Sequence, residues 1–280
     1  MKRTNKLLIM VAIMMLPGFM FTTYAQKAIK LEYNLKKGDR YHSTMDMNQD
    51  IDMEVQGQTM TVSNKMGFEF SYMVSKVEAD SFELKTTIDV VTMNQSVMGM
   101  DIVYDSRDSS TFNNAMVGTK ISDEMNKLIG ATITTTLSKN GNTGSVDLGA
   151  LDKDNNIARN MKTSFSQAVY PDHKVKIGDS WNYDVNTSGI TNMTMHMKYT
   201  LTKITRKQAF ISVEGTIDSP DDSDSQLKGT LSGEMTVDRK TGWTTHSSFD
   251  QDFEMQMEQQ GMSFPATISG SYEINSKKVN

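Results

Sequence analysis

The sequence predicts a mainly antiparallel β protein, and three observations support this prediction. Apolar and polar residues alternate with period two over long stretches, short glycine-containing turns separate these stretches, and helical periodicity is confined to two segments. Alternation of this kind favours antiparallel sheet, because parallel strands are usually buried on both faces and lose it. We therefore expect one large curved sheet, a half-barrel or a two-sheet sandwich.

The first 25 residues have the pattern of a secretory signal peptide. Basic residues precede an apolar run over 7–21, and Thr23 and Ala25 provide small side chains at positions −3 and −1 of a cleavage site before Gln26. As a helix this run would span only about 22 Å, which is shorter than the ~30 Å hydrocarbon core of a bilayer. We expect cleavage after Ala25 and one exported domain over 26–280, located in the periplasm, at the outer membrane or outside the cell.

Composition excludes several classes of function. The 280 residues include no cysteine, which rules out a disulfide scaffold, a thiolate metal site, a cysteine nucleophile and a lipoprotein acylated on cysteine. The formal net charge is −5 and no block of basic residues occurs, which argues against nucleic-acid binding. The mature chain is thus expected to be acidic and to lack a membrane-spanning segment, with peripheral outer-membrane association as one option.

The alternation can be followed along the chain. From Tyr41 to Val55 the odd positions are mainly apolar and the even positions polar. After a turn around Gly57 the apolar positions become even over 60–74, and similar alternation continues over 82–104. The last third repeats the pattern over 243–274. Each stretch predicts a strand with one covered face.

Two segments have helical periodicity. Residues 152–169 place apolar side chains on one helical face before Pro171, and a shorter helix is expected over 122–129. Between them, 132–138 and 145–148 flank an Asn140-Gly141 turn and predict a hairpin. The expected chain therefore has one central helix and many strands.

The chain also contains an internal similarity. Gly38-Asp39 precedes an aromatic residue, as does Gly178-Asp179, and 75–77 followed by Phe82 is similar to 202–204 followed by Phe210. Glycine and aspartate in sequence favour a turn, so each pair is interpreted as a structural turn into a strand. We expect two pseudo-repeats, about 29–110 and 172–275, joined by a hairpin and helix over 119–171.

Methionine is unusually frequent, with 24 residues, and recurs in Met-x-Met spacing that places thioethers on one face of a strand. Three interpretations remain open: a packed core, a periplasmic Cu(I) site of soft thioethers, or a flexible apolar groove. The shortage of helix to cover the sheet favours a groove. The candidate lining residues are Met45, Met47, Met53, Phe68, Phe70, Met193, Met195, Met197, Phe253 and Met255.

Signs of catalysis are few. The four histidines are scattered, and neither a His-Glu-x-x-His nor a Gly-x-Ser-x-Gly motif occurs. The aspartates over 218–224 lack the glycine and the distal glutamate of a calcium loop. We therefore expect no enzyme activity, no resident metal and no cofactor.

Several motifs occur in a fixed order after a signal that ends in Ala-Gln. They are Leu-x-Tyr-x-Leu-Lys-x-Gly-Asp-x-Tyr at 31–41, Val-x-x-Gly-Asp-Ser-Trp at 175–181 and Val-Asp-x-x-Thr-Gly-Trp at 237–243. Over 29–275 the chain resembles an uncharacterised, domain-of-unknown-function family of exported proteins from Bacteroidota-like Gram-negative bacteria. This resemblance implies an envelope location and no assigned activity. A looser analogy, based on strand number and the single helix, is to half-barrel lipid carriers of the LolA type.

These observations predict a non-enzymatic envelope protein that binds a lipid or acyl chain in a concavity lined by methionine and aromatic residues. The first alternative is a structural or interaction protein whose β core is fully packed. The second alternative is a Cu(I) binder that uses the Met-x-Met strands.

Overall fold

The structure is a computed structural model that describes residues 27–55, 57–111, 123, 125–151, 167–187, 193–219, 227–259 and 262–279. In the described chain, most residues are in strands and very few are helical. The elements are β1 (Arg40–Val55), β2 (Gln58–Val77), β3 (Ser81–Val97), β4 (Met100–Asp105), η1 (Ser109–Thr111), β5 (Thr132–Ser138), β6 (Thr143–Asp147), η2 (Gly149–Leu151), β7 (Ser180–Thr187), β8 (Met193–Ile204), β9 (Gln208–Asp218), β10 (Leu227–Asp238), β11 (Thr244–Gln259) and β12 (Met262–Val279).

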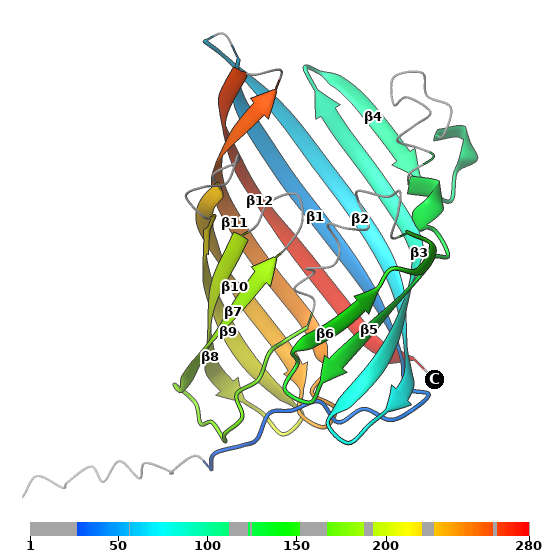
Figure 1. The fold of residues 1–280 in the computed structure, drawn as a ribbon, viewed down its shortest axis with the longest axis vertical. Helices are drawn as coiled ribbons and strands as arrows, with labels where there is room; N and C mark the ends of the chain where they lie inside the picture. Colours follow the sequence, from blue (N-terminus) through cyan, green and yellow to red (C-terminus); the bar gives the residue numbers. More distant parts are fainter. Residues whose placement is uncertain are drawn as a thin grey trace, which may run out of the picture.

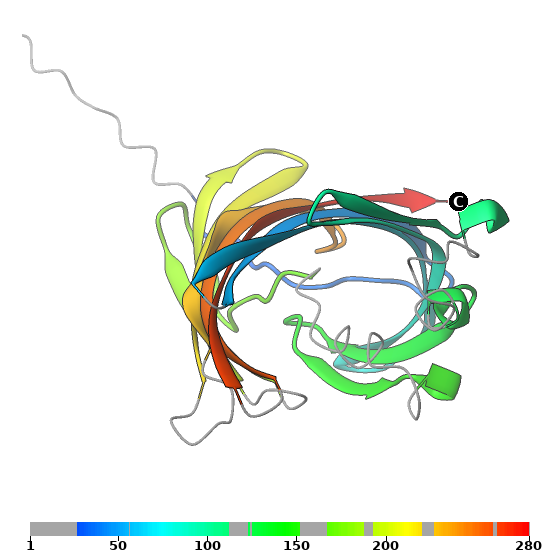
Figure 2. The ribbon, with the colours of Figure 1, turned by 90° about the horizontal axis from the view of Figure 1, so that it is seen from above.

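The described strands form one sheet in the order β6-β5-β3-β2-β1-β12-β11-β10-β9-β8-β7, with β4 paired to the end of β3 that β5 leaves free. All the pairs are antiparallel. The sheet bends into an open curve (Figures 1 and 2). The predicted curved antiparallel sheet is confirmed, and the two layers of a sandwich do not form.

Strand β1 shows how the alternation specifies the two faces of the sheet. Its odd-numbered side chains from Tyr41 to Met53 are buried or half-buried, whereas Asp46 and Asp50 are exposed. The apolar face is the concave one, because Tyr33 belongs to the same core cluster as Tyr41 and lies in a segment that runs inside the curve (Figure 2). The convex face is therefore polar and the concave face apolar.

The two Gly-Asp turns have the same hydrogen bonds. Gly38 and Gly178 have φ values of 88° and 91°, which only glycine adopts readily. Their N–H groups donate to Val74 O and Leu201 O, each at 2.8 Å. In both turns the following aspartate accepts a hydrogen bond, at 3.0 Å, from the backbone N–H three residues before it. β1–β2 and β7–β8 thus begin with the same local structure, as two pseudo-repeats would require.

One detail of the proposed repeat is wrong by one residue. Lys76 lies opposite Glu83, and its counterpart Lys203 lies opposite Phe210, so Phe210 corresponds to Glu83 and not to Phe82. Phe82 is buried, whereas Phe210 lies on the convex side under the Lys203 ammonium, which is 5.1 Å from the ring centroid. The bulge before each lysine shifts the alternation by one position.

Two irregular segments fill one end of the curve. We call residues 29–35 the N-terminal strap and residues 167–175 the second strap. In the N-terminal strap, the N–H groups of Tyr33 and Asn34 donate to Lys139 O and Thr241 O, so the strap bridges turns from distant parts of the sheet. The buried residues of the two straps form the main core cluster together with residues of β1–β3, β5 and β7–β11. We call this the packed end and the opposite end, with the turns around Gly57 and Gly99, the far end.

The helical predictions lie mostly outside the described residues. Of the predicted helix over 152–169, only 167–169 is described, and this part is not helical. The reason is that its backbone pairs with distant groups: the N–H of Ala168 donates to Thr244 Oγ1 at 3.1 Å and that of Tyr170 to Asn140 O at 2.7 Å. Within 122–129, the described residues 123 and 125–128 are helical. The predicted hairpin is confirmed as β5–β6.

Candidate ligand-binding face

The concave face consists of rows of side chains that lie opposite one another on successive strands. One such row contains Met45 and its neighbours Phe68 and Ile274, and the next contains Met47 with Met66 and Tyr272. Alternation on each strand and in-register pairing between strands together bring residues that are far apart in sequence onto one surface. This apolar surface is the candidate binding face.

At the packed end this face is fully covered. The rings of Tyr41 and Trp243 stack with centroids 4.0 Å apart, and the Trp243 indole N–H donates to Ser276 Oγ at 2.8 Å. The Tyr33 phenol donates to Ala168 O at 2.9 Å, and burial raises the pKa of this phenol far above its ordinary value. This half of the concavity is therefore protein core.

Toward the far end, most of the described apolar side chains of β1, β2, β11 and β12 are only half-buried, although Val62 and Ala266 are buried. They come from four neighbouring strands and form a continuous patch by register. The half-buried apolar residues of this patch, which we call the far patch, are Met47, Ile51, Met53, Met60, Phe253, Met255, Phe264 and Ile268.

The structure brings together several of the residues predicted to line a site. Met47, Met53, Phe253 and Met255 lie in the far patch, and Met45 borders it. Phe68 and Phe70 lie on the same face but are buried, in a second core cluster with Met125, Leu128 and the hairpin. That cluster covers the β2–β3 side of the face.

The methionines of β8 are placed differently. Met195 and Met197 are buried at 2% and 3% exposure, and their cross-strand neighbours are Val185 with Ile217 and Tyr183 with Gly215. The side chain of Met193 lies outside the described residues. No second thioether lies directly opposite Met195 or Met197 in these pairs. Elsewhere on the concave face, Met47, Met66 and Met93 lie opposite one another on β1, β2 and β3.

Glycines shape the apolar face on β9 and β10. A Cβ added to Gly233 would lie 2.5 Å from Cδ1 of Phe249, and one added to Gly215 would lie 2.6 Å from the Met197 sulfur. At Gly233 a methyl group would also lie 2.2 Å from the Ser248 carbonyl oxygen and has no room. At Gly215 the end of the flexible Met197 side chain would have to move. These glycines let large side chains lie along the sheet.

Four carboxamides that share the concave face are not among the predicted site residues. They belong to the apolar phase of their strands, and all four are half-buried. Their polarity departs from the alternation, and this departure is the signal that could have identified them. They are Gln49, Asn64, Gln95 and Gln251.

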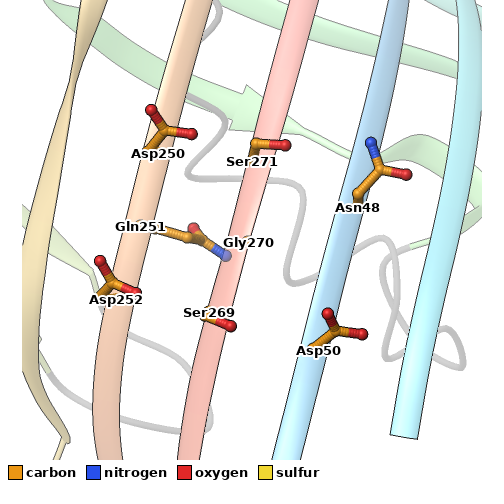
Figure 3. A pocket seen from close by; sticks show the side chains of 8 residues that line it. All are labelled: Asn48, Asp50, Asp250, Gln251, Asp252, Ser269, Gly270 and Ser271. Carbon is orange, nitrogen blue, oxygen red and sulfur yellow. The ribbon is translucent and has the colours of Figure 1, made fainter.

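A polar hollow of about 370 Å³ lies on the opposite, convex face. Asp250 and Asp252 of β11 flank Ser269 and Ser271 of β12, and the side chain of Gln251 points toward Gly270 (Figure 3). The carboxylates are solvent-exposed, and no cluster of three or more histidine, aspartate or glutamate residues suited to a metal is found in the described chain. The hollow has the character of a solvated acidic surface.

Two histidines of the sheet make local polar contacts. His196 Nδ1 lies 2.9 Å from Asp184 Oδ1, and His246 Nδ1 lies 2.9 Å from Asn275 Oδ1. Both pairs are on exposed strand positions of the convex face. Both pairs are thus on the face opposite the candidate binding face.

A model of a family of unknown function, DUF6263, matches residues 153–244. The matched stretch contains the second Gly-Asp turn and Trp243, and it agrees with the predicted resemblance to an uncharacterised family. No curated protein matches the chain significantly. No helix of the described chain is long and apolar enough to cross a bilayer.

Among solved structures, the sheet is similar to part of lipovitellin, in a structure titled for its lipid–protein interactions. The TM-score is 0.52 at 9% identity, over 87% of this chain and 25% of the lipovitellin chain. This chain thus corresponds to about a quarter of lipovitellin, and the similarity is one of fold.

Two further structures align with lower scores. An outer membrane channel of Pseudomonas putida F1 has a TM-score of 0.22 at 6% identity, over 88% of this chain and 97% of that one. A DUF1329 family protein of Desulfovibrio piger has a TM-score of 0.16 at 14% identity, over 82% and 83%. Scores of this size do not define a common fold.

Proposed function

We propose that the mature chain is a non-enzymatic, exported envelope protein that binds an apolar ligand, a lipid or an acyl chain, on the far patch. The observation that carries this proposal is the contrast between the two halves of one apolar face. The straps cover the packed end completely, whereas Met47, Met53 and Phe253 remain half-buried. A contiguous apolar surface that is left partly accessible commonly marks a binding site.

The composition of the far patch suits an acyl chain. Met47, Met53 and Met255 have flexible, polarisable side chains that adapt to irregular apolar partners. Phe253 and Phe264 add rigid apolar area beside them. Burial of apolar surface contributes roughly 25 cal/mol per Å², so even a few methylene groups on this patch add measurable affinity.

The similarity to lipovitellin supports the same proposal by analogy. The shared feature is a large curved antiparallel sheet, and the lipovitellin structure is titled for lipid–protein interactions. A fold accommodates many functions, so the far patch carries the proposal, and the fold adds only that such a sheet is compatible with lipid. Export is supported by the signal-like residues 1–25.

Binding can be tested with a dansyl-labelled undecanoic acid added to the chain 26–280. We expect saturable fluorescence enhancement, and we expect Met53→Glu to weaken the affinity by at least tenfold because a carboxylate in the patch must be desolvated. Asn48→Glu is the matched control, since Asn48 is exposed on the convex face of the same strand opposite Lys65. Circular dichroism establishes that each variant is folded.

Absence of saturable binding by the folded wild-type chain would contradict the proposal and favour a structural or interaction protein with a fully packed core. Equal loss in Met53→Glu and Asn48→Glu would also contradict it, because the two substitutions are on opposite faces. Export has a separate test: expression of the full chain in a Gram-negative host should yield an envelope protein that begins at Gln26.

A further inference from the structure

Four carboxamides lie side by side on the concave face. Gln49 of β1 pairs with Asn64 of β2, and Asn64 pairs with Gln95 of β3. On the other side of β1, Gln49 and Gln251 of β11 flank Gly270 of β12. These residues occupy one register level across five neighbouring strands, and we call Gln251, Gln49, Asn64 and Gln95 the amide row.

The amide row divides two apolar rows. On the side of the packed end, it is bordered by Met47, Met66 and Met93. On the side of the far end, it is bordered by Ile51 and Val62. Four amides at one level of a surface that is otherwise apolar place hydrogen-bonding groups inside the far patch, between Met47 and Ile51.

At its centre the row has no side chain. A Cβ added to Gly270 would lie 2.5 Å from Asn48 O and 3.1 Å from Gln49 Cα, so the backbones approach too closely for another residue type. The Gln251 side chain points toward this glycine (Figure 3). The row of side chains is therefore interrupted at Gly270, between Gln49 and Gln251.

Hydrogen-bonding capacity at this level is not fully used within the described chain. Asn64 Oδ1 and the Tyr272 hydroxyl, one row away, are buried and have no hydrogen-bond partner there. Buried polar atoms are nearly always paired. The Asn64 oxygen therefore requires a hydrogen-bond donor, the Tyr272 hydroxyl can donate to an acceptor, and a ligand that carries both kinds of group would satisfy them. Carboxamides offer both donors and acceptors to such a partner.

The partner group must be uncharged. In the described chain, the amide row and the rows on either side contain no aspartate, glutamate, lysine or arginine. A charged group placed there would lose its hydration without gaining an opposite charge. A neutral group with strong hydrogen-bond acceptors next to an apolar chain fits the amide donors and the far patch together.

We infer that the amide row binds the carbonyl groups that link the acyl chains of an ester-linked lipid, with these chains lying on the far patch. This inference rests on the proposed function and deepens it by naming the ligand class. The N–H groups of Gln49, Asn64 and Gln95 and the Tyr272 hydroxyl donate to the ester carbonyls. A free hydroxyl of the glycerol donates to Asn64 Oδ1, and the hydrocarbon contacts Met53 and its neighbours.

The test compares two neutral probes that differ only in the linkage. A dioleoylglycerol (ester) and a dioleylglycerol (ether) compete with the dansyl-labelled fatty acid for the chain 26–280. We expect the ester to bind about tenfold more tightly, because an ether lacks the carbonyl acceptors, and a tenfold change corresponds to about one good hydrogen bond.

The variants Asn64→Leu and Gln49→Met, which preserve side-chain size, should reduce the ester preference to near one while leaving ether binding unchanged. Asn48→Leu, on the convex face of β1, is the control and should keep the wild-type preference. Equal affinity of the wild type for ester and ether would overturn the inference and leave the proposed function standing. Failure of both probes and of the fatty acid would overturn the proposed function itself.

A variant that folds but loses ester and ether binding together would also overturn the inference, because the amides would then act only through the shape of the surface. The ester–ether comparison on the wild type requires no substitution. It therefore decides the inference even where a variant does not fold.

Discussion

Lys278 Nζ lies 2.6 Å from Asp39 Oδ1 and joins the last strand of the sheet to the turn that precedes the first. The Asp39 carboxylate also accepts a hydrogen bond from the Lys36 N–H at 3.0 Å, and its side chain is only 12% exposed. The same ammonium lies 5.9 Å from the centroid of the Tyr41 ring. This contact closes the packed end across 239 residues of sequence.

The Asp39 contact predicts a pH dependence of stability. Burial alone would raise the pKa of Asp39, but the hydrogen bonds from Lys278 and Lys36 outweigh it and hold the pKa below its usual value. The contribution to folding is therefore complete above the unfolded-state pKa of about 4 and is lost as the pH falls through the lower folded-state pKa. We expect Asp39→Asn to lower the free energy of unfolding at pH 7 by about 1 kcal/mol.

Urea denaturation of wild type and Asp39→Asn at neutral and acidic pH measures this difference, which should shrink once Asp39 is protonated in the folded state. Asp179→Asn is the control, because Asp179 accepts the equivalent backbone hydrogen bond and has no ion pair in the described chain. A difference for Asp39→Asn that stays the same down to pH values below the folded-state pKa would contradict the assignment.

The buried tyrosines predict resistance to alkaline ionisation. Burial raises the pKa of the Tyr33, Tyr170, Tyr199 and Tyr272 phenols far above the ordinary value, and it raises the pKa of Tyr41 to about 12. Because these folded-state pKa values exceed the unfolded value of about 10, the associated stability is complete below pH 10 and is lost as the pH rises further.

Titration followed by tyrosinate absorbance should therefore show a group of phenols that ionise only when the chain unfolds. The same chain in urea should titrate in a single step near the ordinary tyrosine pKa of about 10. Ionisation of all tyrosines in that single step while the circular dichroism remains native would show that the packed end is accessible to water.

We expect a side chain at position 233 to cause a steric clash on the apolar face. Gly233→Ala places a methyl group against Phe249, which is 2% exposed, so the ring must move or the strands must separate. Overpacking of this kind costs about 1–3 kcal/mol. Ser232→Ala, on the exposed convex face of the same strand, should change the free energy of unfolding by less than about 0.5 kcal/mol in urea denaturation. Equal effects of the two substitutions would contradict this packing.

We expect a hydrogen bond to the Thr244 hydroxyl to hold the second strap in place. Its hydroxyl is buried and accepts a hydrogen bond from the Ala168 N–H at 3.1 Å. Thr244→Val leaves this N–H without its partner and should destabilise the chain by about 1–3 kcal/mol, while Thr244→Ser keeps the acceptor and should cost less. Thermal denaturation orders the three proteins, and limited proteolysis should cut near 168 sooner in Thr244→Val. A valine variant as stable as the serine variant would argue against the hydrogen bond.

The face on which an amide-row residue lies can be predicted from the sequence, but its neighbours on other strands cannot. Gln49 shares the odd phase of Tyr41 and Met53, so its place on the apolar face can be predicted from β1 alone. Its position beside Asn64 and across Gly270 from Gln251 depends on the register between strands, which no single strand specifies. For the same reason, the sequence could not show which predicted site residues lie in the far patch. Met195 has the apolar phase of its strand, but it is buried beside Val185 and Ile217.

The fold class, the apolar and polar faces of each long strand and the turns at Gly38 and Gly178 could be predicted, because they follow from side-chain alternation and local backbone preferences. That the strands form one open curve, that the straps fill one end and that the far patch stays half-buried is known only from the folded chain. These features depend on contacts such as those of Tyr33 with Lys139 and Ala168, more than 100 residues away, and local pattern carries no information about such partners.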